Sequence, residues 1–417
     1  MLKRSKLDIA IIGSGPAGLA AAVEADRRGV KNLVVFERDE LPGGILRQCI
    51  HNGFGLEKFK EELTGPEYAN RYIKMAESAG IDIELNTTVL EIEKDRTLTS
   101  VSEHSGLRKY ECKSIILAMG CRERPRGALG IPGTRPAGIF TAGHAQRLIN
   151  IEGYMPGEKV VILGSGDIGL IMARRLTLEG AEVVAVAEIL PYSSGLIRNV
   201  VQCLNDYEIP LLLSHTVAEI HGDKRVEGVT LVKVDTDWNP IKRTEQYVEC
   251  DTLLLSVGLI PENELSKQAG VLIDPKTGGP YVNDCLETSV EGIFSCGNVL
   301  HVNDLVDNVS NEGELAATGA YERIKGKTLG RERIMEVEAD EGVGQVVPQK
   351  ISGDRETIFY LRVKKPMGKM VLRVGENFEK KFSYARPSEM IRLKIPKKIF
   401  SQMGSSVSKL QIRCEER

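Results

Sequence analysis

Two segments of the chain share one pattern of hydrophobic and polar positions. Each opens with a short apolar run, at residues 9–12 and 160–163, and continues through a glycine-rich turn into a stretch with helical spacing. A second apolar run closes each segment, at residues 33–36 and 183–187. Short apolar runs bounded by turns are typical of buried parallel strands. The pattern therefore predicts two strand–helix–strand units, and hence an α/β fold.

Other stretches carry a different period. Residues 81–95 and 211–235 alternate between apolar and polar positions, which predicts antiparallel strands. Residues 288–304 read as a strand and turn, followed by a helix expected around residues 311–323. Short β-like runs separated by Pro and Gly then predict a small β-rich domain at residues 340–417.

The two glycine-rich turns give the units their chemistry. The first is GSGPAG at residues 13–18 and the second is GSGDIG at residues 164–169. Each second strand ends in a glutamate 19 positions after the last glycine of its turn: Glu37 (37 − 18) and Glu188 (188 − 169). Such a turn lets the backbone approach a pyrophosphate at a helix N-terminus, and the acidic residue binds the ribose hydroxyls. Two dinucleotides are expected, unless one unit is only a scaffold, and Glu188 favours NAD(H) over NADP(H).

Composition and charge limit the kinds of partner that the chain is expected to bind. Of the 417 residues, 42% are hydrophobic and 27% charged, and a net charge of −3 gives no reason to expect nucleic acid. No apolar run reaches the roughly 18 residues of a membrane span, and we interpret the start MLKRSKLDIAIIG as a first strand rather than a leader. Residues 361–417 hold 15 Lys and Arg against 5 Asp and Glu. This surface is either simply solvated or a docking face for an acidic partner.

The eight cysteines are scattered and none forms a C-x-x-C pair. This spacing predicts no metal site and no thioredoxin-type disulfide, and it fits a cytoplasmic location. Cys49 and His51 lie just after the Gly43-Gly44 pair. Cys49 either forms part of the wall of a cofactor site, or packs as a small apolar residue, or acts as a single redox thiol whose pKa His51 lowers.

These motifs together resemble the two-dinucleotide-binding flavoprotein superfamily. The resemblance rests on both turns, on Ala118-Met119-Gly120, on Val257-Gly258 and on GIFSCGN at residues 292–298, and it covers residues 1–330. It implies two Rossmann-like domains, with the NAD-binding domain inserted in the FAD-binding domain. The expected boundaries are, for the FAD-binding domain, residues 1–125 and 283–335; for the NAD-binding domain, residues 126–282; and for the β-rich domain, residues 340–417.

Four further stretches look like a narrower family: GGILRQCIHNGFGLEKFKEELTGPEYA, GCRERPRG, IPGTRPAGIFTAG and LVDNVSNEGELAA. They resemble the NAD/FAD-dependent oxidoreductase subunit that works with FAD-dependent glycerol-3-phosphate or 2-hydroxy-acid dehydrogenases, and are similar to the NAD/FAD-type subunits of opine and dye-linked amino-acid dehydrogenases. The resemblance implies oligomers and a second dehydrogenase subunit that carries FAD, an iron–sulfur centre or a cysteine-ligated metal.

The turns and the resemblance together give the expected cofactor contacts. For FAD they are Gly13, Gly15, Pro16, Ala17, Gly18, Glu37, Arg38, Gly43, Gly44, Ile45, Gln48, Val89, Ala118, Met119, Gly120, Gly297 and Asn298; for NAD(H) they are Gly164, Gly166, Asp167, Ile168, Glu188 and Gly258. Asn298 departs from the superfamily, which usually has aspartate there. Its amide oxygen can still accept a hydrogen bond from the FAD ribityl chain, without the assistance of a charge.

Three functions remain open at this stage. The favoured one is an FAD-containing oxidoreductase that passes hydride between NAD(H) and FAD as the NAD-linked subunit of a dehydrogenase. The second is a stand-alone thiol or disulfide reductase that uses Cys49. The third is a non-catalytic assembly protein that keeps the fold as a scaffold.

Overall fold

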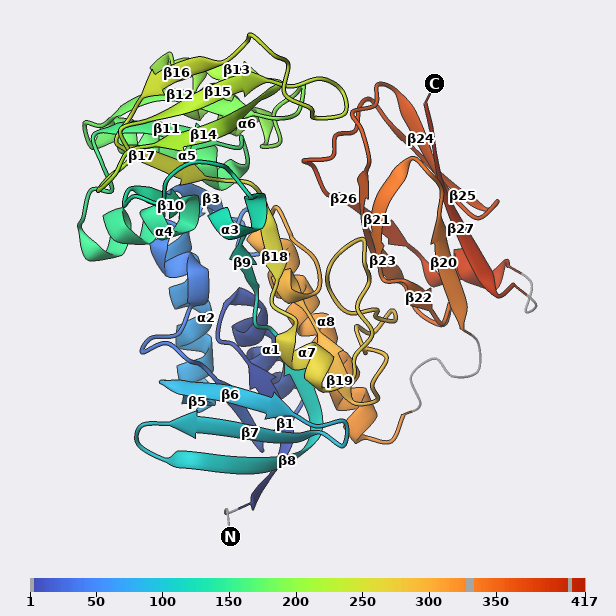
Figure 1. Ribbon diagram of the computed structural model, residues 1–417. Coiled ribbons are helices and arrows are strands. Elements are labelled where there is room, and N and C mark those ends of the chain that lie inside the picture. The colour runs from blue at the N-terminus through green and yellow to red at the C-terminus, as the bar shows by residue number, and fades with distance from the viewer. Residues whose placement is uncertain (1–3, 328–333, 404–406, 417) are drawn as a thin grey trace. The chain divides into compact units, whose positions relative to one another are not determined.

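The computed structural model describes residues 4–327, 334–403 and 407–416 (Figure 1). The chain forms two compact units: Met1–Cys121 with Pro261–Arg417, here called the first unit, and Arg122–Ile260, the second unit. The chain passes from one unit to the other at 121/122 and 260/261, whereas the sequence predicts domain borders at 125/126 and 282/283. Residues 261–282 group with the first unit because Ala269 and Val271 are buried in the same apolar cluster as its strands.

A mostly parallel sheet forms the centre of the first unit. Its strands run in the order β5-β2-β1-β8-β7-β6, and β19 pairs with β8. Their bounds are β1 Arg4–Ile12, β2 Leu33–Phe36, β5 Asp82–Glu84, β6 Thr87–Ile92, β7 Thr97–Ser102, β8 Gly106–Leu117 and β19 Ile293–Ser295. Ile9 and Ile11 of β1 enter one apolar cluster and Ala10 and Ile12 another, so both faces of the central strand are covered.

Helices α1 (Pro16–Arg27) and α8 (Val306–Ile324) pack against each other on one face of this sheet (Figure 1). They approach closely because their contact residues are small: a Cβ on Gly313 would lie 2.2 Å from the Ala17 carbonyl oxygen. The helix expected around residues 311–323 thus begins five residues earlier, at Val306. Its first turn contains the buried polar residues Asp307 and Asn308, a combination that hydrophobic periodicity does not detect.

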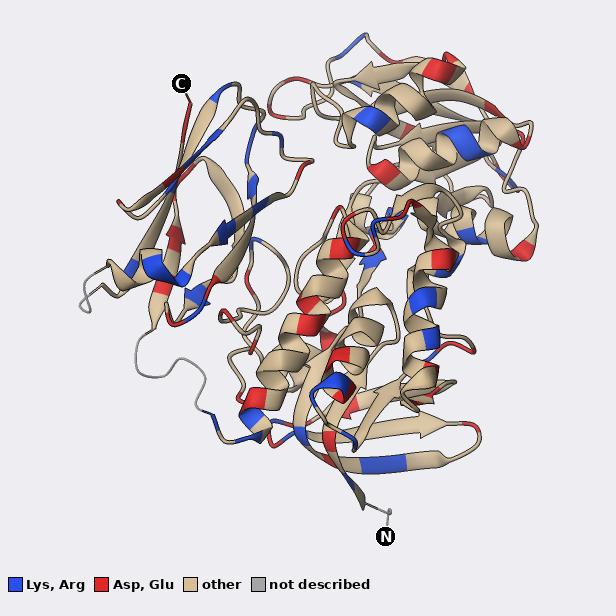
Figure 2. Cartoon of the chain, turned by 180° about the vertical axis from the view of Figure 1, so that it is seen from behind, with Lys and Arg blue, Asp and Glu red and all other residues tan. Residues whose placement is uncertain are grey.

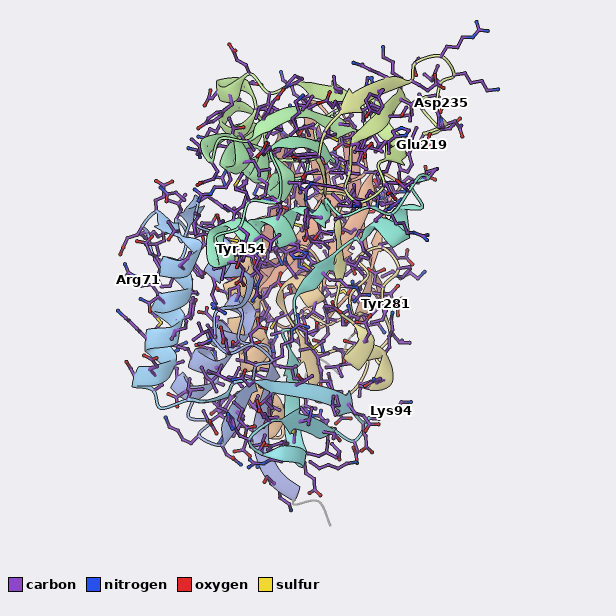
Figure 3. All side chains as sticks on the ribbon, turned by 60° about the vertical axis from the view of Figure 1, so that its left-hand side comes forward. Arg71, Lys94, Tyr154, Glu219, Asp235 and Tyr281 are labelled. Carbon is purple, nitrogen blue, oxygen red and sulfur yellow. The ribbon has the colours of Figure 1, made fainter. Side chains whose placement is uncertain are left out.

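Other helices and short strands complete the first unit. Their bounds are η1 Gly44–Gln48, α2 Gly65–Ser78, α7 Glu264–Gln268, η4 Gly297–Val299, β3 Asn52–Phe54 and β4 Leu63–Thr64. Helix α2 packs on α1 with its inner face. On its outer face Arg71 projects away from the sheet (Figure 3) and pairs with Glu61 at 2.6 Å.

The second unit has a parallel sheet of its own, in the order β10-β17-β11-β12-β13, beside an antiparallel sheet β14-β15-β16. The strands are β10 Ile139–Thr141, β11 Lys159–Leu163, β12 Glu182–Glu188, β13 Leu211–Leu213, β14 His215–His221, β15 Gly228–Lys233, β16 Gln246–Glu249 and β17 Thr252–Leu255. The helices are α3 Arg126–Leu129, α4 Ala142–Arg147, η2 Leu148–Glu152, α5 Asp167–Leu178, α6 Ile197–Cys203 and η3 Asn205–Tyr207. Strands β9 (Cys121–Glu123) and β18 (Leu259–Pro261) pair where the chain crosses between the units.

The prediction of antiparallel strands at residues 81–95 and 211–235 is only partly confirmed. Strands β6 and β7, and β14 and β15, do pair antiparallel. At the start of each predicted stretch, however, β5 is parallel to β2 and β13 is parallel to β12. Each of these is a three-residue strand. Alternation over three residues is too short to distinguish an edge strand of a parallel sheet from an antiparallel one.

The residues from Met335 to Glu416, here called the C-terminal part, build two sheets around a separate core. The sheets are β22-β20-β27-β24-β25 and β21-β23-β26. The bounds are β20 Met335–Ala339, β21 Val343–Val347, β22 Lys350–Ile351, β23 Thr357–Val363, β24 Met370–Val374, β25 Phe378–Phe382, β26 Ile391–Ile395, α9 Lys397–Ser401 and β27 Lys409–Glu416. Lys and Arg recur over these strands, with acidic residues between them (Figure 2). Among the described residues, no helix has the length and apolarity needed to cross a membrane.

Candidate functional site

The first glycine turn has the local geometry of a pyrophosphate cradle. Gly13 has a φ of +99°, and a Cβ there would lie 2.6 Å from the Ala118 carbonyl oxygen. A Cβ on Gly18 would lie 1.8 Å from the Gly13 carbonyl oxygen, whereas one on Gly15 would meet no atom within 4 Å. The outer two glycines therefore allow the tight turn and close helix packing, and the middle one leaves open space at the N-terminus of α1. This division of roles is what a bound pyrophosphate requires.

A second segment packs directly against this turn. The Gly43 N–H donates to the Ser14 carbonyl at 3.0 Å, and a Cβ on Gly44 would lie 3.0 Å from the Gly15 Cα. The structure thus brings the predicted Gly43-Gly44 pair onto the predicted glycine turn.

A third segment, the turn at Gly297, also packs against the start of α1. A Cβ on Gly297 would lie 2.9 Å from the Cβ of Ala17, so only small residues fit between η4 and α1. Pro16 and Ala17 form the start of α1, where the turn joins the helix. The predicted positions Gly297 and Ala17 are therefore in contact, although they lie far apart in the sequence.

Glu37 is held in place by the turn. Its carboxylate accepts hydrogen bonds from the Ser14 N–H at 2.8 Å, the Ser14 hydroxyl at 2.6 Å and the Asp39 N–H at 2.9 Å. Two of these bonds end on Oε2 and one on Oε1, so Oε1 can still accept a bond from a ribose hydroxyl. The residues present fit the adenosine end of FAD.

The second turn repeats this arrangement around Ser256. Gly164 has a φ of +96°, and a Cβ there would lie 2.2 Å from the Ser256 carbonyl oxygen. A Cβ on Gly169 would lie 2.6 Å from the Ser256 Cβ, and the Gly169 N–H donates to the Ser256 hydroxyl at 3.0 Å. A Cβ on Gly166 would have the Ser256 hydroxyl as its nearest neighbour, at 3.2 Å. Ser256 thus occupies the place that Ala118 has in the first unit.

Glu188 repeats the contacts of Glu37 and adds one. It accepts from the Ser165 N–H at 2.9 Å, the Ser165 hydroxyl at 2.6 Å and the Leu190 N–H at 3.0 Å. A further hydroxyl, that of Ser194, donates to it at 2.8 Å. Serine and glutamate are 23 residues apart in both units. Sequence reasoning missed the two serines, although their shared place in both G-S-G turns was a usable signal.

The Gly297-Asn298 turn is tied to the helix that follows it. Glu312 of α8 accepts from the Gly297 N–H at 2.7 Å and contacts His301 Nε2 at 2.7 Å, with both side chains buried. Asn298 accepts the Asn303 N–H on its amide oxygen at 3.0 Å and donates to the Cys121 sulfur at 3.6 Å. One acceptor position of the Asn298 amide oxygen is therefore already used within the chain, and the other is available to a ribityl hydroxyl.

Four buried polar atoms follow this turn without a hydrogen-bond partner in the described residues: His301 Nδ1, Asn303 Oδ1, Asp307 Oδ1 and Asn308 Oδ1. Buried polar groups normally have partners, so a cluster of unpaired ones marks a place for a ligand. The set begins beside the turn expected to meet the ribityl chain and continues into the first turn of α8. FAD is a polar ligand of the kind that these atoms fit. The sequence did not single them out, because they lie in a polar stretch without a motif.

The surroundings of Cys49 disfavour its thiolate form. Its S–H donates to the Ile45 carbonyl at 3.3 Å, and burial raises the pKa of the thiol to about 12. His51 Nδ1 contacts the Asn52 carbonyl at 3.0 Å, and its ring lies 4.9 Å from that of Phe54. Desolvation acts against the expected lowering of the Cys49 pKa by His51, which stays a prediction. None of the eight cysteines, all of them in the described residues, forms a disulfide.

The remaining predicted positions have varied surroundings. On the FAD side, Arg38 and Ile45 are exposed, Gln48 is buried, and Val89 and Met119 pack against the core. The Gly120 carbonyl accepts the Glu262 N–H at 3.0 Å.

On the NAD side, Asp167 accepts from the Leu196 N–H at 2.8 Å and from the Asn199 amide at 2.7 Å. Its carboxylate therefore positions the start of α6, a role that the motif did not indicate. Ile168 packs against the core of the second unit, and the Gly258 carbonyl accepts the Arg124 N–H at 3.1 Å.

Known proteins carry the same arrangement. Residues 7–320 match the family described as pyridine nucleotide-disulphide oxidoreductase. The NAD(P)H coenzyme A polysulfide/persulfide reductase of Pyrococcus horikoshii is 29% identical over 73% of this chain and 65% of its own length. An opine oxidase subunit of Agrobacterium tumefaciens is 26% identical over 76% of this chain and 66% of its own length. The chain thus spans less than two thirds of either relative.

A solved structure gives the same picture. Thioredoxin reductase of T. acidophilum aligns with a TM-score of 0.63 and 25% identity, over 76% of this chain and 98% of its own. This likeness confirms the predicted α/β class with two Rossmann-like units. The matched segment contains both glycine turns and both glutamates, and members of the family use FAD and NAD(P)H. The chain belongs to the pyridine nucleotide-disulphide oxidoreductase family.

Proposed function

We propose that this chain transfers hydride between NAD(H) and bound FAD, as the NAD-linked subunit of a dehydrogenase that has a second subunit. The observation that carries the proposal is the repetition of one cradle. Two glycine turns, each with a serine-held glutamate 23 residues on, are present in a chain whose Cys49 thiol has a raised pKa. Two dinucleotide sites without an activated thiol favour direct transfer between the two cofactors.

The chain's residues have binding roles in this reaction. FAD, when bound, supplies the flavin ring that exchanges hydride with the nicotinamide. The turn at residues 13–18 offers backbone N–H groups to a pyrophosphate, and Glu37 accepts from a ribose. Asn298 and the unpaired atoms of residues 301–308 are the groups available to the ribityl and ring end. No side chain has to donate or accept a proton in the hydride step itself, so positioning is the chain's contribution.

The second turn supports NAD(H) rather than NADP(H). Glu188 is a buried carboxylate at the position of the motif that binds the ribose 2′-hydroxyl. Ser165 and Ser194 donate to its Oε2, while its Oε1 accepts the Leu190 N–H and keeps a position for that hydroxyl. A 2′-phosphate there would be repelled, and no arginine takes the place of the glutamate at this position of the motif.

The proposed place in a larger enzyme draws on the relatives' names and on composition. One relative is named as a subunit of an opine oxidase. The 15 Lys and Arg against 5 Asp and Glu at residues 361–417 would suit an acidic partner. We infer a partner subunit that carries FAD, an iron–sulfur centre or a cysteine-ligated metal, and a substrate of the glycerol-3-phosphate, 2-hydroxy-acid, opine or amino-acid class.

An anaerobic titration tests this proposal. The purified, FAD-loaded chain is reduced with dithionite and then, separately, with NADH and NADPH, while the flavin absorbance is recorded. We expect about two electrons per FAD, delivered faster by NADH than by NADPH, and reduction of an artificial dye without an organic substrate. A flavin that NADH leaves oxidised would contradict the proposal.

A second function has one observation in its favour. The relative from Pyrococcus horikoshii is named as a coenzyme A polysulfide/persulfide reductase, which is a sulfur chemistry. For this chain the candidate thiol is Cys49, and the raised pKa argues against it. If Cys49 is held as a sulfenate or as a mixed disulfide with coenzyme A, its reduction to the thiol takes two electrons besides the two of FAD. Uptake of about four electrons per FAD, with a thiolate-to-flavin absorbance band midway, would favour this second function.

A further inference from the structure

Arg362, on strand β23 of the C-terminal part, reaches the segment that follows the Gly297-Asn298 turn. Its guanidinium pairs with the carboxylate of Asp304 and donates to the Val302 carbonyl at 3.2 Å. The same side chain donates to the Pro387 carbonyl at 2.9 Å, within the C-terminal part. Arg362 thus connects strand β23 and the segment at Pro387 to residues 302–304.

Asp304 is held from a second point as well. Its other carboxylate oxygen accepts the Met390 N–H at 2.6 Å. The side chains of Arg362 and Asp304 are only 16% and 13% exposed. Burying such a pair costs desolvation, and the cost is offset only when every donor and acceptor is matched. The two carbonyls and the Met390 N–H are such partners, and they fix the position of Asp304.

The segment held in this way is bonded to the expected flavin contact. The Asn303 N–H donates to the amide oxygen of Asn298 at 3.0 Å, and the Asn303 side chain donates to the His301 carbonyl at 3.3 Å. The ring of Tyr360, two residues before Arg362 on β23, lies 5.5 Å from the ring of His301. A shift of residues 302–304 would therefore move Asn298.

We propose that Arg362 is a positioning residue for FAD: by holding Asp304 it sets the place of Asn298, so the C-terminal part controls how tightly the flavin is bound and at what potential it is reduced. This inference rests on the proposed contact between the Gly297-Asn298 turn and FAD. It adds a residue from beyond the matched family segment, which ends at residue 320.

Docking of the C-terminal part does not depend on this contact alone. The Gln349 amide donates to Asp274 at 3.0 Å, and the Ser352 hydroxyl donates to Asp284 at 2.7 Å, all among buried side chains. Arg355 pairs with Glu322 near the end of α8 at 3.0 Å. Because these contacts lie away from residues 302–304, Arg355 provides a matched control for Arg362.

The test uses the full-length chain with Arg362→Ala, Arg362→Lys and, as the control, Arg355→Ala. The FAD dissociation constant of each apoprotein is measured by titration, and the midpoint potential of each loaded flavin is measured by redox dye equilibration. For Arg362→Ala we expect about tenfold weaker FAD binding and a shifted potential, because hydrogen bonds to charged groups are lost. Lysine restores the charge but not the fork, so partial rescue is expected. Arg355→Ala should match the wild type.

Two outcomes would overturn the inference. One is an Arg362→Ala protein with unchanged FAD affinity and potential. The other is an equal loss in Arg355→Ala, which would mean that docking in general, rather than Asp304, supports the flavin. Failure of the proposed function is distinguishable, because a wild-type chain that does not bind FAD or is not reduced by NADH shows it without any variant.

Discussion

The two glycine turns share one design, but their surroundings differ. In each, the first glycine has a positive φ near +100° and a serine holds a glutamate 23 residues on. The turn at residues 13–18 is then enclosed by two further segments, Gly43-Gly44 and the Gly297 turn with α8. At the turn of residues 164–169 the close neighbours are Ser256 and the segment Ser194-Gly195. A Cβ on Gly195 would lie 2.7 Å from the Ser165 carbonyl oxygen, and the Ser194 hydroxyl donates to the glutamate.

This difference affects how slowly a bound dinucleotide dissociates, rather than which groups bind it. Both turns offer backbone N–H groups and a carboxylate. The first turn has one N–H fewer, because Pro16 stands where the second has Asp167, so these groups do not favour the first turn.

Enclosure does favour the first turn. Ser256 corresponds to Ala118 and Ser194-Gly195 to Gly43-Gly44, whereas the Gly297 turn with α8 is an additional segment that a ligand at the first turn must move in order to leave. We therefore expect the first turn to retain its dinucleotide as a permanent group and the second to exchange its own during each turnover.

The largest effect is expected from adding one methyl group to the equivalent glycine of each turn. In Gly18→Ala the new Cβ would lie 1.8 Å from a backbone oxygen, which cannot move aside, so the protein should purify without FAD. In Gly169→Ala the nearest atom belongs to the Ser256 side chain, at 2.6 Å. That variant should stay yellow and be reduced by NADH about ten- to a hundredfold more slowly.

The flavin absorbance of the purified variants and stopped-flow reduction are the measurements. Gly127→Ala, whose Cβ would meet no atom within 4 Å, is the control. A Gly18→Ala protein that purifies with bound FAD, and is therefore yellow, would contradict the expected difference between the two turns.

The next effect concerns the two glutamates. Glu188→Gln keeps the size of the side chain and removes its charge, so catalytic efficiency with NADH should fall about tenfold and the preference over NADPH should shrink. FAD content should not change. Glu37→Gln should do the reverse, weakening FAD binding while leaving the NADH to NADPH ratio as it was. Steady-state kinetics with both nucleotides and FAD titrations distinguish these outcomes, and a changed cofactor preference in Glu37→Gln would contradict the assignment.

Alkaline pH should destabilise the first unit more than the second. Burial raises the pKa of five cysteines in the first unit and two in the second; these are Cys49, Cys112, Cys285, Cys296 and Cys414, against Cys203 and Cys250. For Cys203 and Cys250 the pKa is raised to about 11. Unfolded thiols ionise near their ordinary pKa, while these folded thiols keep their protons, so stability is present below that pKa and falls as the pH rises through it.

Each such thiol lowers the free energy of unfolding by up to about 1.4 kcal/mol per pH unit above its ordinary pKa. Calorimetric unfolding at pH 8 and pH 10, with proteolysis and mass spectrometry to identify the unit that opens, measures the difference. Equal loss in both units would show that the thiols do not control it.

The smallest effect is expected from Cys49→Ser. With the pKa of this thiol raised to about 12, NADH-dependent dye reduction should stay within about twofold of the wild type. Alkylation of Cys49 by iodoacetamide at pH 8, followed by mass spectrometry, should be about a thousandfold slower than that of free cysteine. A variant without activity would instead support the thiol reductase.

Local spacing made much of the nucleotide-binding architecture predictable. The glycine turns and Glu188 are separated by short, fixed distances, so a linear motif identifies them. Arg362 and Asp304 are 58 residues apart and belong to no motif, and their contact depends on how the C-terminal part docks. The orientation of β13 was missed because a three-residue strand carries no period, and the pKa of Cys49 because burial depends on the whole fold.

The close contact of Ala17 with Gly313 has a consequence for synthesis of the chain. These residues are 296 positions apart (313 − 17), and the whole inserted unit, Arg122–Ile260, is translated between them. Domains fold as units as they emerge from the ribosome. The second unit can therefore fold while the first glycine turn still lacks its partner helix α8. The cradle that should hold its ligand most firmly is the later of the two to be completed.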